Sequence, residues 1–171
     1  MSILVFGDSF IGAFNLVYDN HLKIHKFKGA TMKGIGKVDN ENRNKIINIV
    51  KKNKNNKCLV FNFGQVDLYF SYYYNKFVTK KKFNMDSIIK NYIKFINSLP
   101  CDNCNKVVFA VYPTTIKDKN IFDVLIHYGI LSEQIVESIS DDEKRKVSDF
   151  KFRYDMYIKF NKLFEKYCKL Y

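Results

Sequence analysis

A serine stands directly after the first apolar run of the chain, where an α/β protein would place a nucleophile. The run at residues 2–6 is followed at once by Gly7-Asp8-Ser9. Buried parallel strands are near-continuous apolar runs, and chemistry in open α/β sheets gathers beyond their carboxyl ends. A serine on the turn into a helix can present its hydroxyl at the rim of the sheet, as a nucleophile requires. The alternative is an ordinary turn with no reactive role, because Gly, Asp and Ser are common turn residues.

The elements that would position Ser9 alternate between strands and helices. Apolar runs predict strands, and polar-apolar periodicity predicts helices between them. The expected strands cover residues 3–6, 22–27, 58–63 and 107–112, and the expected helices cover 10–18, 40–52, 66–78 and 85–98. Such alternation implies right-handed crossovers and a parallel sheet with helices on both faces. The sequence therefore predicts an α/β fold.

The last third of the chain follows a different pattern. After Pro113 we expect a loop-rich stretch, and then one long helix that runs to the end of the sequence. Ser140 and Glu143 have the spacing of a capping box at the start of that helix. We find no repeat, linker or second domain, and residues 51–57 are interpreted as a charged turn. The expectation is one domain over residues 1–171, either complete or the front part of a longer protein.

Composition restricts the partners. The 171 residues carry a formal net charge of +12, but only Arg43, Arg145 and Arg153 are arginines. Specific nucleic-acid recognition favours arginine, so we interpret most lysines as solvated surface and nucleic acid as an unlikely partner; a polyanion-binding face is the alternative. No apolar run approaches the roughly 18 residues of a membrane helix, and no signal segment is recognised. We expect a cytoplasmic protein of unknown oligomeric state.

The four cysteines do not predict a metal site. Cys101 and Cys104 have the spacing of a zinc knuckle or a redox pair, but only Cys58 and Cys168 remain as further thiols. A structural zinc site needs four ligands, commonly two close pairs. We interpret Cys101–Cys104 as a turn between a helix and the next strand in a reducing compartment. No metal and no cofactor are expected.

Several short motifs resemble those of the SGNH (GDSL-type) hydrolase superfamily, over residues 1 to about 115. Gly7-Asp8-Ser9-Phe10 is similar to the first family block, with Ser9 at the nucleophile position. Gly29 occupies the place of the second-block glycine, and Gly64-Gln65-Val66-Asp67 resembles the third block, Gly-x-Asn-Asp. The resemblance implies a flavodoxin-like three-layer sandwich with a central parallel sheet of about four or five strands. It also implies an oxyanion hole formed by the N–H groups of Ser9 and Gly29, and such donors contribute several kcal/mol.

The chain departs from the family pattern at two places. The asparagine that would donate a side-chain hydrogen bond to the oxyanion is Val66 here, and Gln65 is the neighbouring amide that could replace it. The final family block, Asp-x-x-His after the last strand, is not found, because no histidine follows His127. The fifth strand before that block is not found either.

A serine nucleophile needs a base within hydrogen-bond reach. His127 follows the fourth predicted strand, and Asp123 lies four residues before it, so the two could share one helix face. This pair could replace the family's Asp-x-x-His, or it could be an ordinary helix surface. A histidine beyond Tyr171 is the other candidate base. His21 and His25 flank the second strand and are interpreted as structural.

The remaining candidates have structural alternatives. Asp8 and Asp67 could each cap or brace the helix that follows, since aspartate accepts hydrogen bonds from free N–H groups. The tyrosines at residues 69, 72, 73 and 74 could line a sugar or acyl pocket, but helix packing is the commoner explanation for them.

Three hypotheses follow for the function. The first is a serine esterase or acyl hydrolase that acts on an O-acyl group of a carbohydrate or another small ester. The second is a degenerate SGNH-like domain with a binding or scaffolding role. The third is a basic nucleic-acid-associated protein.

Overall fold

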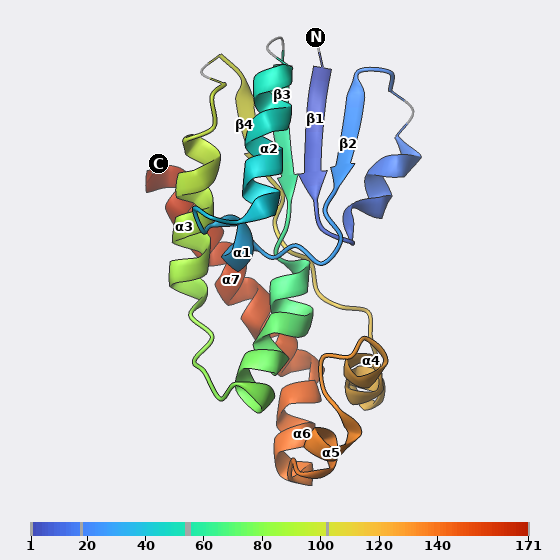
Figure 1. Cartoon of the computed structure of the whole chain (residues 1–171). Coiled ribbons are helices and arrows are strands. Elements are labelled where there is room, and N and C mark those ends of the chain that lie inside the picture. The colour runs from blue at the N-terminus through green and yellow to red at the C-terminus, as the bar shows by residue number, and fades with distance from the viewer. Residues whose placement is uncertain (1, 18, 54–55, 102, 171) are drawn as a thin grey trace.

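The protein has a central sheet of four parallel strands (Figure 1). The computed structural model describes residues 2–17, 19–53, 56–101 and 103–170, and the side chain of residue 56 is outside the description. The strands are β1 (Ser2–Gly7), β2 (Leu22–Lys26), β3 (Asn56–Asn62) and β4 (Asn105–Val108), in the order β2-β1-β3-β4. This is the flavodoxin-like order, so the predicted α/β, flavodoxin-like sandwich is confirmed.

Helices connect and cover the strands. After β1 comes the 3₁₀ helix η1 (Ile11–Leu16), and between β2 and β3 come α1 (Met32–Ile35) and α2 (Glu41–Lys52). Between β3 and β4 lie two π-helical segments, η2 (Asp67–Ser71) and η3 (Tyr74–Val78), and α3 (Met85–Asn97). After β4 come η4 (Asp118–Asn120), α4 (Ile121–His127), α5 (Glu133–Glu137), α6 (Asp141–Ser148) and α7 (Phe150–Leu170). No helix in the described part of the chain is long and apolar enough to cross a membrane.

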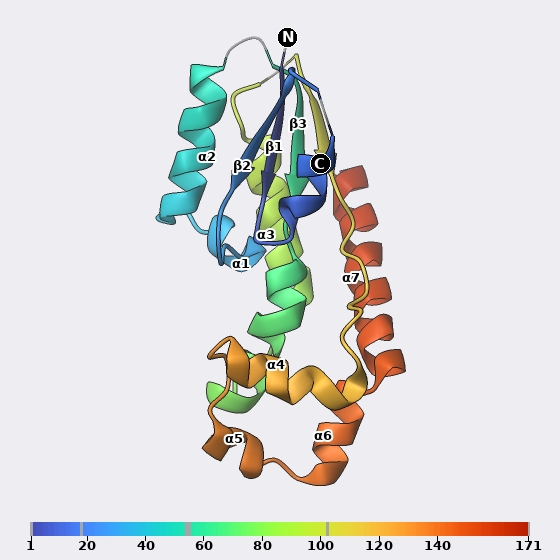
Figure 2. The same cartoon turned by 90° about the vertical axis from the view of Figure 1, so that its right-hand side faces the viewer.

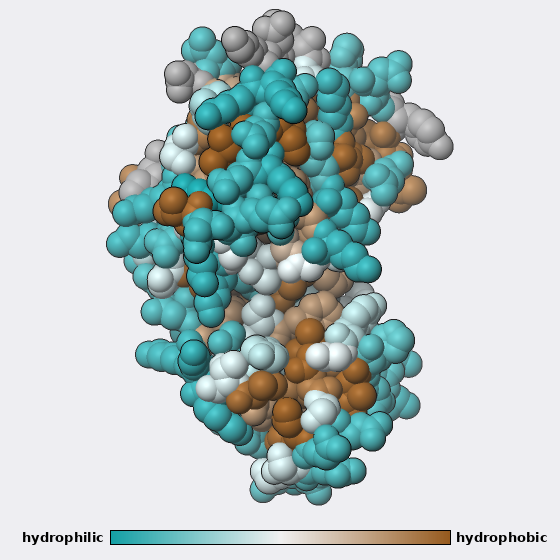
Figure 3. Space-filling view, viewed as in Figure 1, coloured by the Kyte–Doolittle hydropathy of each residue, from teal (hydrophilic) through white to brown (hydrophobic). Residues whose placement is uncertain are grey.

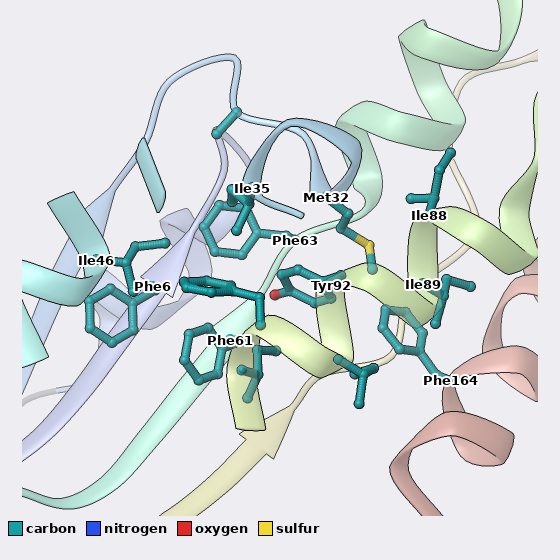
Figure 4. Close-up of a cluster of buried hydrophobic side chains, with 14 of the residues drawn as sticks. Phe6, Met32, Ile35, Ile46, Phe61, Phe63, Ile88, Ile89, Tyr92 and Phe164 are labelled. Atoms are coloured by element: carbon teal, nitrogen blue, oxygen red, sulfur yellow. The ribbon is translucent and has the colours of Figure 1, made fainter. Parts of the chain in front are cut away.

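The alternation of side chains along each strand divides the core into two layers. Leu4 and Phe6 point to the face that packs on α2 and α3, whereas Val5 packs with Ile11 of η1 on the opposite face. Figure 4 shows the larger layer, where Tyr92 of α3 lies among Phe63 and other buried side chains. Figure 2 shows α2 and α7 on opposite sides of the sheet. Both faces of the central strands are therefore buried, as a near-continuous apolar run predicts.

A second, smaller core lies below the carboxyl edge of the sheet. We call it the helical lobe and define it as residues 70–78 and 116–148. Its buried apolar residues are Tyr73, Phe77, Ile121, Leu125, Leu131, Ile139 and Val147. The Tyr73 hydroxyl donates to the Val147 carbonyl oxygen at 2.9 Å. The buried Arg153 of α7 pairs with Asp118 and so ties the lobe to the long helix.

Three expectations on the elements need correction. The strand predicted at 107–112 is found as β4 at Asn105–Val108. The apolar pattern continues beyond the end of β4, but Phe109 and Tyr112 in that continuation are exposed. The single long helix after Ser140 is broken into α6 and α7 at Asp149, whose carboxylate accepts from the Phe152 N–H at 2.8 Å and starts a new helix. The loop-rich stretch after Pro113 contains the short helices η4, α4 and α5.

Other local expectations are confirmed or fall in part outside the described residues. The Ser140 hydroxyl accepts from the Glu143 N–H at 3.3 Å, as the capping box predicts. The turn after α3 is present, and within it Cys101 and Cys104 form a disulfide, a pairing that the sequence analysis did not predict. The expected charged turn at 51–57 includes residues 54–55, which lie outside the described residues.

Candidate functional site

Ser9 and Gly29 meet at the carboxyl edge of the sheet. Ser9 follows β1 and is exposed, and the Gly29 N–H donates a hydrogen bond to its Oγ at 3.4 Å. Gly29 lies three residues beyond β2 with φ of +71°, a left-handed conformation that favours glycine. A Cβ atom there would meet no atom within 4 Å, so the conformation, and not the space, is what favours glycine. Two N–H groups, those of Ser9 and Gly29, thus come from neighbouring loops at one edge.

Asp8 joins the loop after β1 to the loop after β3. Its carboxylate is fully buried and accepts from the Phe10 N–H at 2.9 Å and from the Val66 N–H at 3.5 Å. Burial raises the pKa of this carboxyl, and the hydrogen bonds from backbone N–H groups oppose that effect. Asp8 therefore braces the turn that presents Ser9 as well as the start of the next helical segment.

Asp67 joins the loop after β3 to the start of α1. It is also fully buried, and it accepts from the N–H groups of Met32 at 2.7 Å and Lys33 at 3.3 Å. Burial raises the pKa of this carboxyl to about 7, the backbone donors oppose that shift, and the nearby charge of Asp8 adds to it. Because α1 follows the Gly29 turn, Asp67 holds the second loop of the site in place. The bracing role that we expected for this residue acts on α1 and not on its own helix.

Gly64 lets these loops pack closely. Its φ is +115°, and a Cβ atom on it would lie 2.7 Å from Cγ1 of Val111 and 2.9 Å from Sδ of Met32. Only glycine fits this position without displacement of its neighbours.

Gln65 does not supply the missing oxyanion donor. Its side chain is fully buried, and neither its amide nitrogen nor its oxygen has a hydrogen-bond partner among the described residues. It does not line the cavity at Ser9. Val66 does line the cavity, but its side chain has no hydrogen-bond donor. The described residues thus offer backbone donors at Ser9 and no amide side chain in the family's position.

A cavity of about 680 Å³ opens at Ser9 between the edge of the sheet and the helical lobe. Ser9 and Gly29 lie on the wall formed by the sheet, and Phe70, Tyr74 and Tyr128 lie on the wall formed by the lobe. Figure 3 shows hydrophobic side chains at the surface over the lobe, in the lower half of this face, as well as in its upper half. The volume is within the range of small-molecule sites, roughly 300–1,000 Å³.

Among the described residues no histidine forms a hydrogen bond with Ser9 or lines its cavity. His127 is exposed at the end of α4, its ring packs edge-on against Tyr128, and it does not line the cavity. No ion pair joins it to Asp123, which is also exposed, within the described residues. The expected Asp123–His127 pair is therefore absent from this arrangement.

The other two histidines belong to the region of β2. His25 stacks on Phe6, and its buried Nε2 has no hydrogen-bond partner among the described residues; burial, together with Lys23, lowers its pKa. His21 is exposed in the turn before β2. Neither forms a hydrogen bond with Ser9 in the described part of the chain.

Sequence reasoning missed the residues that give the cavity its charge. Lys28, Lys33 and Lys81 line it, and we had interpreted such lysines as solvated surface. Lys28 stands next to Gly29, and this adjacency was the only sequence signal for any of them. No group of three His, Cys, Asp or Glu side chains that could hold a metal ion occurs within the described residues.

Comparisons with protein-family models, with curated proteins and with solved structures found no match to this chain.

Proposed function

We propose that the protein is a serine acyl hydrolase of the SGNH type that cleaves a small ester, with Ser9 as the nucleophile. One observation carries the proposal. The exposed Ser9 hydroxyl lies at the carboxyl end of a central parallel strand, in a cavity, with the Gly29 N–H aimed at its oxygen at 3.4 Å. A nucleophile and a backbone donor that converge on one point are what acyl transfer requires.

The chemistry would proceed in two steps. Ser9 Oγ attacks the ester carbonyl carbon, and the N–H groups of Ser9 and Gly29 stabilise the negative charge that develops on the carbonyl oxygen. The bond to the alcohol breaks, the alcohol leaves with a proton, and an acyl group remains on Ser9. Water then attacks the acyl carbon, which releases the acid and restores the serine. Asp8 and Asp67 act as positioning residues, because they hold the loops that carry these groups.

The group that accepts the proton of the Ser9 hydroxyl is tested separately. His127 is the described histidine that adjoins the cavity wall along the chain, through its neighbour Tyr128. If it acts as the base, His127→Ala lowers the rate of serine acylation by several powers of ten. If the rate is unchanged, the base is another group.

Labelling with a fluorophosphonate probe tests the nucleophile. We expect rapid stoichiometric labelling of the wild type and none of Ser9→Ala. Ser71→Ala is the matched control, because Ser71 also lines the cavity and its labelling behaviour should equal that of the wild type. Labelling that persists in Ser9→Ala would reject the assignment of the nucleophile.

A binding domain without chemistry is the second candidate. It is favoured by the lack of a histidine bonded to Ser9 within the described residues and by Val66 at the amide position. Failure of the wild type to label at high probe concentration, in a folded protein, would decide for this candidate.

A further inference from the structure

The walls of the Ser9 cavity carry positive charge that no carboxylate neutralises. Lys28 comes from the loop between β2 and α1, Lys33 lies in α1 itself, and Lys81 comes from the segment after η3. No Asp or Glu of the described residues lines this cavity, and none forms an ion pair with these three lysines. Asp8 and Asp67 are fully buried and engaged by backbone N–H groups. A negatively charged ligand would therefore find cations here with no competing anion beside them.

The same charge extends over the rim of the cavity. Two smaller depressions, of about 210 Å³ and 300 Å³, adjoin it and share lining residues with it, Lys33 in one case and Lys81 in the other. Further lysines in these depressions are Lys37, Lys76, Lys80 and Lys82. Of these, Lys76 is paired with Glu143 at 2.8 Å. A continuous cationic rim attracts anions from solution and raises their rate of encounter with the site.

The segment that carries Lys81 is held in an unusual backbone conformation. Lys80 has φ of +54°, the only left-handed residue other than glycine in the described chain. The Lys81 N–H donates to the Asn75 carbonyl oxygen at 2.9 Å, and the Asn75 side chain donates to the Ser71 carbonyl oxygen at 2.6 Å. Strained backbone and π-helical segments occur preferentially at functional sites, and here both occur next to the cavity.

The lobe supplies aromatic side chains to the same cavity. Tyr128 is 63% exposed and its ring packs against Phe70 at 5.2 Å between centroids, and Tyr74 is also exposed. Exposed aromatic rings that gather in one cavity favour a ligand with an apolar face, since its burial removes both surfaces from water.

We propose that the cavity binds a small ester whose alcohol part is a ring that carries an anionic group, with Lys28, Lys33 and Lys81 as the cations that recognise it. That the ligand is an ester rests on the proposed esterase function. That it carries an anionic group rests on the lysines alone. The cavity volume of about 680 Å³ fits a molecule of this size and not a length of nucleic acid. The anionic group has two possible sources, a sugar carboxylate or a sugar phosphate.

The test compares acetylated sugars that carry a carboxylate, its uncharged methyl ester or a phosphate. The ligands are an O-acetylated hexuronic acid, its uncharged carboxyl methyl ester, and an O-acetylated hexose phosphate. Binding is measured by calorimetry to the Ser9→Ala protein, so that no turnover occurs. We expect the acid or the phosphate to bind at least about tenfold more tightly than the methyl ester at low salt, and this ratio to fall as salt screens the charges. Whichever of the acid and the phosphate binds more tightly identifies the anionic group as a carboxylate or a phosphate.

Two triple variants locate the effect. Lys28→Gln/Lys33→Gln/Lys81→Gln should reduce the charge preference to near one. Lys151→Gln/Lys159→Gln/Lys162→Gln changes the net charge equally at exposed positions on α7 and should retain the preference. Equal loss in both variants would assign the effect to net charge and overturn the proposal.

The outcomes separate this proposal from the proposed function. Charge-selective binding without Ser9-dependent turnover in the wild type would support anion recognition and reject the esterase. Turnover of the methyl ester and the acid with equal efficiency, together with equal binding, would support the esterase and reject anion recognition. Two further results would reject the recognition of a small anionic ester. One is that none of the three ligands binds at millimolar concentration. The other is that an oligonucleotide binds more tightly, in a salt-dependent way, through the same lysines.

Discussion

The parallel sheet and the helical lobe meet at the Ser9 cavity, and they contribute different kinds of group to it. The sheet side contributes the Ser9 turn and the Gly29 N–H, held by buried carboxylates, together with the side chains of Lys28 and Lys33. The lobe contributes side chains, with Phe70, Tyr74 and Tyr128 on its wall. Backbone groups at the ends of buried strands are fixed by the whole core, whereas exposed side chains on short helices can change without loss of the fold. In this protein the proposed nucleophile and its backbone donor therefore lie on the region that is harder to alter.

The two regions also differ in how they are stabilised. The sheet core contains large, fully buried residues from β1, β3, α2, α3 and α7. The lobe core is smaller and depends on short helices tied by single contacts, such as the Tyr73 hydroxyl on Val147 and the ion pair of Arg153 with Asp118. Regions with fewer buried apolar contacts open at a lower free energy. We therefore expect the lobe to open before the sheet.

The largest expected effect comes from deletion of a core side chain in each region. Phe61→Ala, in β3, should lower the free energy of unfolding by about 3–5 kcal/mol and slow the reaction of Ser9, because the strands that hold the site loosen. Leu125→Ala, in α4, should cost about 2–3 kcal/mol but leave the labelling of Ser9 intact while it weakens ligand binding. Urea unfolding, hydrogen exchange and fluorophosphonate labelling measure these effects.

Hydrogen exchange shows whether the lobe and the sheet open separately or as one cooperative unit. If Leu125→Ala accelerates exchange only at residues 70–78 and 116–148, the lobe opens by itself. If both variants accelerate exchange throughout the chain and abolish labelling alike, the two regions form one cooperative unit and the comparison fails.

The second prediction concerns the buried Asp67, which joins the loops of the site. Its pKa of about 7 in the folded protein lies above the value of 3.8 expected for an unfolded chain. The folded protein therefore holds more protons than the unfolded chain between these values, and the contribution of Asp67 to stability falls as pH rises from about 4 to 7. The slope from this one group is at most about 1.4 kcal/mol per pH unit.

Asp67→Asn should remove this slope, as measured by urea unfolding at several pH values. The variant also alters the hydrogen bonds to Met32 and Lys33, so the slope and not the absolute stability is the quantity to compare. Asp123→Asn is the control, because that carboxylate is exposed in the lobe and its loss should leave the slope unchanged. An unchanged slope in Asp67→Asn would show that this carboxyl ionises as readily in the folded protein as in the unfolded one.

How far the sequence predicts each region follows from how local the determinants are. The strand at Leu4, Val5 and Phe6 is recognisable because burial on both faces gives a continuous apolar run. The Gly29 turn is recognisable because the family resemblance supplies its place and a left-handed conformation favours glycine. β4 is shorter than its apolar pattern because the exposed Phe109 continues that pattern without burial.

The lobe and the charge of the cavity are not local properties. Leu125 and Leu131 pack on Tyr73 and Phe77, which lie about 50 residues earlier in the chain, and no periodicity within 116–139 reveals that contact. The run Lys80–Lys82 has the composition of any solvated surface, and only the fold brings Lys81 to the cavity that Lys28 also lines. The position of a base for Ser9 is likewise not fixed by Asp123 and His127, because an i,i+4 spacing on a helix does not determine which surface that face meets.

The smallest expected effect comes from helix caps, and it compares the same interaction in both regions. Asn84 caps α3 of the sheet core by accepting from the Ser87 N–H at 3.1 Å, and Ser140 caps α6 of the lobe by accepting from the Glu143 N–H at 3.3 Å. Loss of a cap typically costs about 1 kcal/mol. Asn84→Ala should show this cost in the global unfolding of the protein, since α3 packs on the sheet. Ser140→Ala should change the global free energy of unfolding little and should instead accelerate hydrogen exchange within residues 141–148, because the lobe opens first.

Equal shifts of the unfolding midpoint in the two variants would mean that the lobe is as firmly coupled to the sheet as α3 is. The aromatic wall of the cavity would then be as rigid as the turn that carries Ser9.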